Sequence, residues 1–214
     1  MKVSAVLFDL DGTLLNTLTD IAAALNRTLA GRGLPQLTLE EVRAYVGNGS
    51  RRLVERAVPA GTADAVTDAV LAAYRADYDK NCDIATRPYA GIPGTLAALK
   101  AAGIRLAVVS NKPDGAVKAL TDTHFPGIFS SAVGEGPGIR RKPAPDTVLA
   151  AMAKLGVGAE ETVYVGDSEV DVATAKNAGV PCLSALWGFR TRTQLEEAGA
   201  ARFLERPEEL PELI

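Results

Sequence analysis

VSAVLFDLDGT, residues 3–13, begins with the apolar run Val3 to Phe8 and continues directly into Asp9-Leu10-Asp11-Gly12-Thr13. A short apolar run that ends at turn residues is typical of a buried β-strand, and Gly12 lets the chain turn there. Such a turn can aim the carboxylates of Asp9 and Asp11 at one point, where they repel each other unless a cation balances their charge. A divalent cation would let one acid act as nucleophile or metal ligand while the other carries a proton. Taken alone, the motif is equally compatible with a solvated acidic turn.

Further short apolar runs recur along the chain, with helical segments between them. The five runs are Val3 to Phe8, Arg105 to Val109, Ile128 to Val133, Thr162 to Val165 and Pro181 to Leu186. Three of the helical segments end just before a glycine, the usual residue after a helix: Gly94 to Ala102, Ala144 to Leu155 and Ser168 to Ala178. Strands that alternate with helices predict an α/β fold with a doubly wound, Rossmann-like parallel sheet.

The segment from Asn16 to about Thr86 differs because its apolar residues recur at helical spacing and no strand is predicted. The helices expected there are Thr19 to Ala30, Thr38 to Val46, Ser50 to Val58 and Ala63 to Lys80. We therefore predict a small all-helical cap domain, 16–85, inserted into an α/β core of 1–15 and 86–214. An insertion after the first strand starts at the carboxyl edge of the sheet, where parallel sheets bind ligands, so we expect it to act as a lid.

Composition narrows the class of protein. With 214 residues, 47% of them hydrophobic, the chain can bury a sizeable core without disulfides. A net charge of -3 argues against a nucleic-acid partner bound through its phosphates. Cys82 and Cys182 are isolated, which predicts neither a zinc site nor a disulfide and fits a reducing cytosol. The apolar start is too short for a signal core or a membrane span, so we expect a cytoplasmic protein with no membrane partner.

Two further motifs carry polar or basic side chains after predicted strands. Ser110-Asn111-Lys112 follows the run that ends at Val109 and precedes Pro113, a residue suited to the first position of a helix. Its hydroxyl and backbone N–H groups can hold an anion, although a helix cap is the common alternative. In Arg140-Arg141-Lys142-Pro143-Ala144-Pro145-Asp146, the two prolines that follow the lysine restrict the backbone, so one of the cations can be aimed into a site. The alternative is a solvated basic face.

A fourth motif, Gly166-Asp167-Ser168-Glu169-Val170-Asp171, follows the run that ends at Val165. Asp167 would emerge from the strand, and Asp171 lies one helical turn later, where it can orient a ligand or neutralise a lysine. An acidic helix N-terminus is the alternative. Because all four motifs lie at the carboxyl ends of predicted parallel strands, we expect them to converge on one crevice.

The order D-x-D-G-T, S-N, K-P and G-D-x-x-x-D closely resembles the four motifs of the haloacid dehalogenase superfamily of phosphohydrolases, over nearly the whole chain. The helical insertion resembles the cap of that superfamily's first cap class. The stretches that look most like bacterial phosphoglycolate phosphatases are Phe8 to Thr13, Tyr45 to Gly49, Arg87 to Gly91 and Val108 to Pro113. One departure is Asn16-Thr17, where those phosphatases often carry Asp-Ser. It falls at the entry to the cap and leaves the catalytic set intact.

The resemblance implies roles for the residues that match its motifs. Asp9 would be the nucleophile that forms an aspartyl-phosphate, and Asp11 would protonate the leaving alkoxide and then activate water. Mg2+ would be held by the Asp9 carboxylate, the Asp11 carbonyl and Asp167. Lys142 would balance charge on the phosphoryl group, and Asp171 would hold Lys142 or a metal-bound water. The residues that would hold phosphate oxygens are Ser110, Asn111, Gly12 and Thr13.

The implied activity is a Mg2+-dependent phosphatase for a small phosphorylated metabolite, with 2-phosphoglycolate favoured, in a monomer or homodimer. Transport ATPases of this superfamily carry Thr in place of Asp11 and dehalogenases lack the second Asp. A cap without Lys from Leu18 to Asp79 argues against a phosphonoacetaldehyde hydrolase. Enzymatic alternatives are a hexose phosphomutase of the β-phosphoglucomutase type, a pyrophosphatase and a nucleotide phosphatase. A non-catalytic alternative is a module that binds phosphate or signals through phosphorylated Asp9.

The turn Gly47-Asn48-Gly49, followed by Arg51 and Arg52, occupies the place of the cap specificity loop of that superfamily. We expect the glycines to let backbone N–H groups approach the substrate, and Arg51 or Arg52 to attract a carboxylate such as that of 2-phosphoglycolate. The alternative is a helix–helix turn with solvated arginines, because adjacent arginines cannot both face inward on a helix.

Overall fold

The computed structural model describes residues 3–214, which divide into two compact units. The core unit contains the chain up to Leu15 together with Pro88–Ile214, and the cap unit is Asn16–Arg87. The cap unit therefore contains the predicted cap, 16–85, and two residues beyond it.

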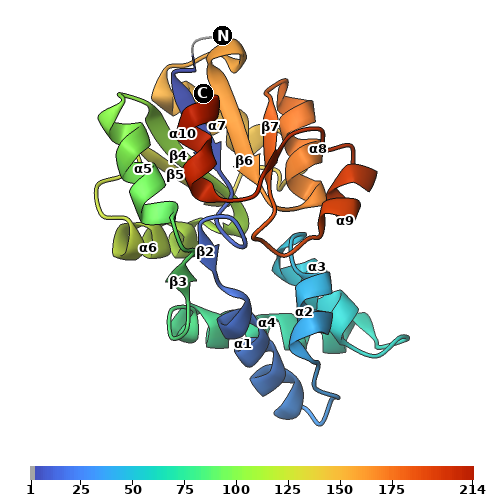
Figure 1. Cartoon of the computed structure of the whole chain (residues 1–214). Helices are drawn as coiled ribbons and strands as arrows, with labels where there is room; N and C mark the ends of the chain where they lie inside the picture. The colour runs from blue at the N-terminus through green and yellow to red at the C-terminus, as the bar shows by residue number, and fades with distance from the viewer. Residues whose placement is uncertain (1–2) are drawn as a thin grey trace. The chain divides into compact units, whose positions relative to one another are not determined.

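A six-stranded parallel sheet runs through the core unit (Figure 1). Its order is β5-β4-β1-β6-β7-β8, so the first strand of the chain lies in the middle. The strands are β1 (Ala5–Phe8), β4 (Arg105–Pro113), β5 (Ser131–Glu135), β6 (Thr162–Gly166), β7 (Cys182–Ala185) and β8 (Phe203–Leu204). Because β4, β1 and β6 are adjacent and parallel, the residues that follow them meet at one edge of the sheet.

Helices cover both faces of this sheet, which confirms the predicted α/β fold class. Helix α7 packs on β1, β4, β5 and α8, whereas α8 packs on β6 and β7, α6 on β4 and β5, and α5 on β4. The helices are α5 (Ile92–Ala101), α6 (Asp114–His124), α7 (Asp146–Leu155), α8 (Glu169–Ala178), α9 (Arg192–Glu197) and α10 (Leu210–Leu213), with 3-10 turns η1 (Ala159–Glu161) and η2 (Pro207–Glu209). As predicted, α7 and α8 end at glycines in the left-handed conformation, Gly156 and Gly179.

Alternation along β1 places its side chains in both layers of the core. Leu7 joins a buried cluster with Val148 of α7 and Ala175 of α8. Phe8 points to the opposite face, where its ring centroid lies 6.2 Å from that of Phe129 in an edge-to-face arrangement. The strand is therefore buried on both faces, which explains why its sequence is continuously apolar rather than alternating.

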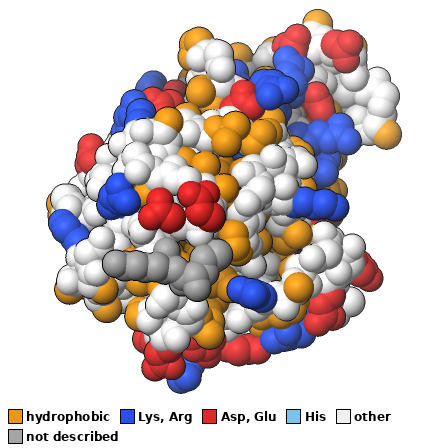
Figure 2. Space-filling model, turned by 90° about the horizontal axis from the view of Figure 1, so that it is seen from above, with side chains coloured by type: hydrophobic (Ala, Val, Ile, Leu, Met, Phe, Trp, Pro, Cys, Tyr) orange, Lys and Arg blue, Asp and Glu red, His pale blue; other side chains and the backbone are white. Residues whose placement is uncertain are grey.

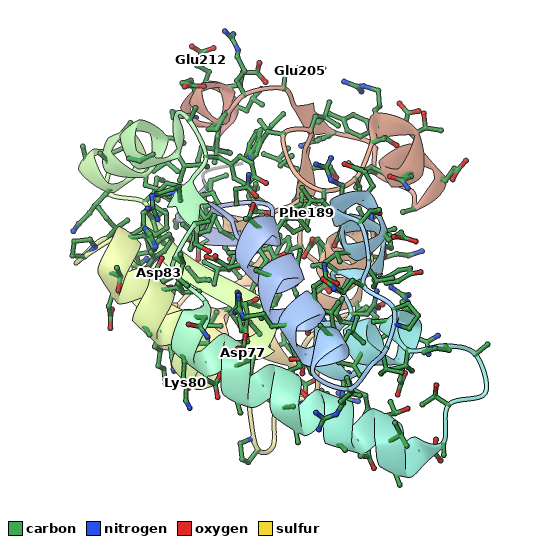
Figure 3. The ribbon with its side chains drawn as sticks, turned by 90° about the horizontal axis from the view of Figure 1, so that it is seen from below. Asp77, Lys80, Asp83, Phe189, Glu205 and Glu212 are labelled. Atoms are coloured by element: carbon green, nitrogen blue, oxygen red, sulfur yellow. The ribbon has the colours of Figure 1, made fainter. Side chains whose placement is uncertain are left out.

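The cap unit contains the helices α1 (Leu18–Ala30), α2 (Leu39–Tyr45), α3 (Gly49–Ala57) and α4 (Asp64–Asn81). The carboxylate of Asp20 on α1 accepts the backbone N–H groups of Ile84, Ala85 and Thr86 at 2.8–3.0 Å. This buried carboxylate joins the end of the cap sequence to its first helix. On the exposed side, Asp77 projects from α4 (Figure 3) and forms an ion pair with Arg27 of α1 at 2.5 Å.

Some predicted bounds were wrong. Asn16 belongs to a two-residue strand, β2 (Leu15–Asn16), which pairs with β3 (Arg87–Pro88) in a separate sheet, so the helical region starts at Leu18. Pro113 is the last residue of β4 and the N-cap of α6, not the first residue of that helix.

On the part of the surface that is coloured by residue type in Figure 2, acidic, basic and apolar side chains are interspersed. Among residues 3–214, no helix combines the length and the apolar composition that crossing a bilayer requires.

Candidate active site

Asp9 follows β1 directly, and a tight turn begins after it. Its N–H donates to the carbonyl of Val165 on β6 at 2.9 Å, which holds Asp9 against the neighbouring strand. The Leu10 carbonyl then accepts the N–H groups of residues 13, 14 and 15 at 3.0–3.4 Å, and these hydrogen bonds close the turn. Gly12 has φ of 91°, and a Cβ at this position would overlap the carboxyl group of Asp167. Both its conformation and its surroundings therefore require glycine here.

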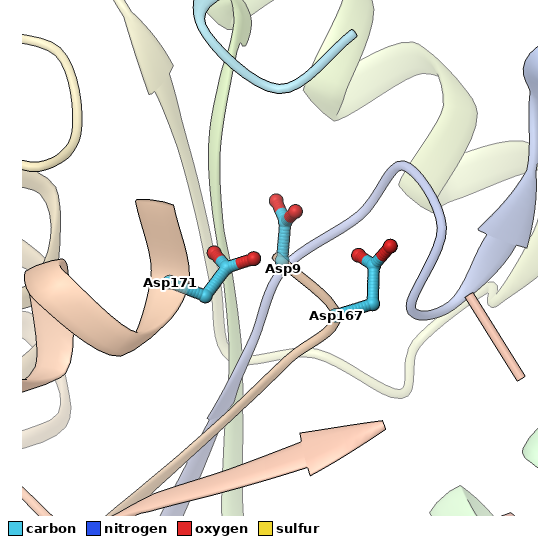
Figure 4. A group of neighbouring side chains, drawn as sticks. All are labelled: Asp9, Asp167 and Asp171. Atoms are coloured by element: carbon cyan, nitrogen blue, oxygen red, sulfur yellow. The ribbon is translucent and has the colours of Figure 1, made fainter. Parts of the chain in front are cut away.

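Three buried carboxylates converge beside this turn: those of Asp9, Asp167 and Asp171 (Figure 4). One oxygen of each lies within 4.8 Å of the others. Asp167 comes from the loop after β6, where it accepts the Thr13 hydroxyl at 3.0 Å and the Phe189 N–H at 2.7 Å. Asp171 comes from the first turn of α8. Segments far apart in the sequence thus build one acidic cluster.

The cluster carries negative charge that the protein balances only in part. Burial raises the pKa of Asp9 well above its usual range; Asp171 and Asp167 raise it further, and Lys142 opposes the shift. Burial, followed by the charge of Asp171, raises the pKa of Asp167 to about 7. Crowded carboxylate oxygens of this kind are the donors that hard divalent cations prefer. The residues present therefore fit a bound metal ion.

Lys142 lies inside the cluster with only 2% of its side chain exposed. Its Nζ is 2.8 Å from Asp9 Oδ1 and 2.7 Å from Asp171 Oδ1, and it donates to the Tyr164 hydroxyl at 3.0 Å. Burial alone would lower the pKa of Lys142, but the two carboxylates outweigh it and the net direction is upward. Burial likewise raises the pKa of Asp171, but Lys142, Ser168 and Tyr164 outweigh it and the net direction is downward. Lys142 and Asp171 thus form a buried charged pair.

Of the three cations in the basic motif, Lys142 is the one in this cluster. Arg140 instead pairs with Asp146 at 2.8 Å, and Arg141 lies 3.6 Å from Glu135. Both arginine side chains are substantially exposed. The structure therefore resolves the choice among the three cations that the sequence had left open.

Ser110 and Asn111 lie in the part of β4 that extends beyond β1, and both are buried. The Asn111 side chain donates to the Lys142 carbonyl at 3.0 Å and accepts the Lys142 N–H at 2.6 Å. The Ser110 Oγ accepts the N–H of Lys112 at 3.2 Å. The Asn111 amide thus fixes the backbone of the lysine segment.

Residues from all four sequence motifs therefore meet at this edge of the sheet: Asp9, Ser110, Lys142 and Asp167. The model of the haloacid dehalogenase-like hydrolase family matches residues 6–185. The chain belongs to this family. The predicted resemblance is therefore confirmed, and so is the prediction that the chain is an enzyme.

Relatives within the haloacid dehalogenase-like hydrolases match along most of the chain. A phosphoglycolate phosphatase of Aquifex aeolicus is 36% identical over an aligned region that covers 98% of this chain and 95% of the relative. A phosphoglycolate phosphatase of Rhodospirillum rubrum is 40% identical, with 92% and 84% covered. Crystal structure comparison finds a Lactobacillus delbrueckii protein assigned as a phosphoglycolate phosphatase, with TM-score 0.96, 36% identity and coverage of 100% and 99%. CbbY of Rhodobacter sphaeroides, crystallised with phosphate, gives TM-score 0.76, 30% identity and coverage of 97% and 96%.

Two residues of this haloacid dehalogenase-like hydrolase lie in the site without having been assigned a role from the sequence. Lys112 Nζ is 2.5 Å from Asp11 Oδ1, with 4% of the lysine side chain exposed. Tyr164, on β6, is completely buried and donates its hydroxyl to Asp171 at 2.8 Å. Lys112 directly follows the Ser-Asn motif, a signal that was available. Tyr164 is indistinguishable in sequence from an ordinary strand residue.

The residues predicted for substrate selection belong to the cap unit. The turn 47–49 leads into α3, whose arginines pair with acids of the same unit. Arg51 Nη2 lies 2.7 Å from Asp68, and Arg52 Nη1 lies 3.1 Å from Glu55. Their role in selecting the substrate stays a prediction.

Proposed function

We propose that this hydrolase is a Mg2+-dependent phosphatase that acts on a small phosphorylated metabolite, with 2-phosphoglycolate as the favoured substrate. The observation that carries the proposal is the pairing of Asp9, placed in an acidic cluster next to a buried lysine, with Asp11 two positions later. The choice of substrate is supported by relatives that are named phosphoglycolate phosphatases and match this chain over most of its length.

The acidic cluster fits a hard divalent cation. We assign Asp9, Asp167 and the backbone carbonyl of Asp11 as the groups that would hold Mg2+. When bound, Mg2+ would offset the repulsion between the carboxylates and a phosphate dianion and make the phosphorus more electrophilic. Asp171 has a different task, because its oxygens already accept Lys142, Tyr164 and Ser168.

In the first half reaction, a carboxylate oxygen of Asp9 attacks phosphorus while the bond from phosphorus to the ester oxygen breaks. Asp11 gives its proton to the departing oxygen, so that an alcohol leaves and an aspartyl-phosphate remains on Asp9. Lys142, 2.8 Å from Asp9 Oδ1, holds the nucleophile in place and balances its charge. Ser110 donates its hydroxyl to an oxygen of the transferring group.

In the second half reaction, the Asp11 carboxylate takes a proton from water, whose oxygen attacks the same phosphorus. The bond from Asp9 to phosphorus breaks, inorganic phosphate leaves, and both aspartates return to their starting states. A second carboxylate that serves as acid and then as base explains why the phosphoenzyme turns over, in contrast to a phospho-aspartate that persists as a signal.

Phosphate release from 2-phosphoglycolate tests the proposal. We expect turnover with Mg2+, loss of turnover in EDTA that Mg2+ restores, and a fall of at least about 10³-fold in kcat for Asp9→Asn, because the nucleophile is lost. Asp122→Asn, an exposed aspartate on α6, is the matched control and should keep wild-type activity. Turnover in EDTA or by Asp9→Asn at the wild-type rate would refute the mechanism. Isomerisation of a hexose phosphate without net phosphate release would favour a phosphomutase instead.

A further inference from the structure

The environment of Lys112 is unusual for a lysine. Its side chain is 4% exposed, and its ammonium lies 2.5 Å from the carboxylate of Asp11. Lys118, on the adjacent helix, shows the ordinary situation: it is 54% exposed and pairs with Asp114. Burying an ammonium group is unfavourable unless the charge is compensated, so this position calls for a specific explanation.

Lys112 and Lys142 are the two buried lysines among residues 3–214, and both lie in the site. Each contacts a different carboxylate of the Asp9–Asp11 motif. Lys142 contacts Asp9, the proposed nucleophile. Lys112 contacts Asp11, the proposed acid that must reach the leaving oxygen of the substrate. One cation therefore lies on the side of the attacking group, and the other lies on the side of the leaving group.

The leaving group of 2-phosphoglycolate brings a negative charge to that second side. A single CH2 group separates its ester oxygen from its carboxylate, so an acid that reaches the oxygen has the substrate carboxylate beside it. An ammonium group next to that acid is within reach of the same carboxylate. Because an ammonium has three N–H donors on one rotating nitrogen, it can hold two carboxylates at once.

We propose that Lys112 determines substrate specificity by binding a carboxylate that lies one carbon from the leaving oxygen. This inference rests on the proposed phosphatase function and assigns its selectivity to the core unit. The cap arginines have less support for this task, because Arg51 pairs with Asp68 and Arg52 with Glu55 inside the cap unit. Lys112, by contrast, contacts a residue of the reaction itself.

The test compares two substrates that share the same ester linkage: 2-phosphoglycolate and 2-hydroxyethyl phosphate, which carries a hydroxymethyl group in place of the carboxylate. The readout is the ratio of kcat/KM for the first to that for the second, measured for wild type, Lys112→Gln and Lys112→Met. We expect the wild-type ratio to exceed 1 and both variants to lower it by about 10- to 100-fold, mostly through KM, because a charge-assisted hydrogen bond is lost. Any effect on the chemistry that both substrates share cancels in this ratio.

The control is Lys118→Gln, which removes an exposed lysine from the adjacent helix and should leave the ratio unchanged. Equal losses on both substrates would overturn the inference, because Lys112 would then act only by positioning Asp11. A lowered ratio in Arg51→Ala or Arg52→Ala, but not in the Lys112 variants, would overturn it in favour of the cap. Variants inactive on both substrates would overturn it as well. If wild type hydrolyses 2-hydroxyethyl phosphate but not 2-phosphoglycolate, both the favoured substrate and the role of Lys112 fail, whereas the phosphatase chemistry stands.

Discussion

Replacing Tyr164 by phenylalanine removes a single oxygen atom from the centre of the buried charged cluster. The hydroxyl donates to Asp171 at 2.8 Å and accepts from Lys142 at 3.0 Å, and the residue is completely buried. A hydrogen bond to a charged group contributes about 1.5–3 kcal/mol. Because Asp171 keeps its bonds from Lys142 and Ser168, we expect a loss smaller than the sum of two such bonds, about 2–3 kcal/mol in the free energy of unfolding. For a chain of this length, that corresponds to a fall in Tm of about 4–12 °C.

Urea unfolding in EDTA measures this loss, with the fluorescence of Trp187, the single tryptophan, as a reporter for the core unit. Thr174→Val is the matched control, because it removes a buried hydroxyl of α8 that donates to a neutral carbonyl at 2.6 Å. We expect this control to cost less than about 1 kcal/mol. A loss for Tyr164→Phe no larger than that for Thr174→Val would refute the argument that the charges of Lys142 and Asp171 make this hydroxyl important.

Two further predictions concern the metal site. Because the folded pKa of Asp167 is raised to about 7, its contribution to stability in the metal-free protein is fully present below its unfolded pKa and is lost as pH rises through 7. A metal binds the ionised form, so the rise in Tm on replacing EDTA with Mg2+ should be larger at pH 8 than at pH 6, and an equal rise at both would contradict it. A Cβ at Gly188 would overlap the Asp167 carboxyl group, whereas one at Gly94 on α5 would meet no other residue within 4 Å. We therefore expect Gly188→Ala to raise the Mg2+ concentration for half-maximal activity by about 10-fold or more, and Gly94→Ala to leave it unchanged. If the two variants gave the same dependence of activity on Mg2+ concentration, Asp167 would accommodate the methyl group and the prediction would be wrong.

The sequence predicts the architecture well, because its signals are local and repeat. Apolar runs of four to six residues alternate with helices, three of which end just before a glycine, and this alternation defines a parallel sheet. The polar residues after those runs must then lie at one edge. Asp9 and Asp167 are brought together in this way. The elements that could not be predicted are the short ones: β8 has two residues and α10 has four, too few for any periodicity to appear.

Within the site, the partners of each side chain could not be predicted. Lys142 and Tyr164 are 22 positions apart, and no spacing rule indicates that the hydroxyl reaches the ammonium group. Asn111 is assigned to phosphate by resemblance, yet its side chain is bonded in both directions to the backbone of Lys142. Such pairings depend on the register between neighbouring strands and on the course of the loops after them, which are properties of the whole sheet.

The central position of β1 has a consequence for how the protein is made. Its two neighbours in the sheet, β4 and β6, both come later in the chain, and Thr13 and Asp167, which are bonded in the site, are 154 positions apart. At about 5–20 residues per second, a ribosome needs about 8–30 s to add that length. The helices of the cap unit are contiguous and can fold during this interval, whereas residues 5–8 remain an apolar strand without partners. The apolar strand therefore stays without its two neighbours until β4 and β6 have been made, and the acidic cluster cannot form before Asp171 has been added.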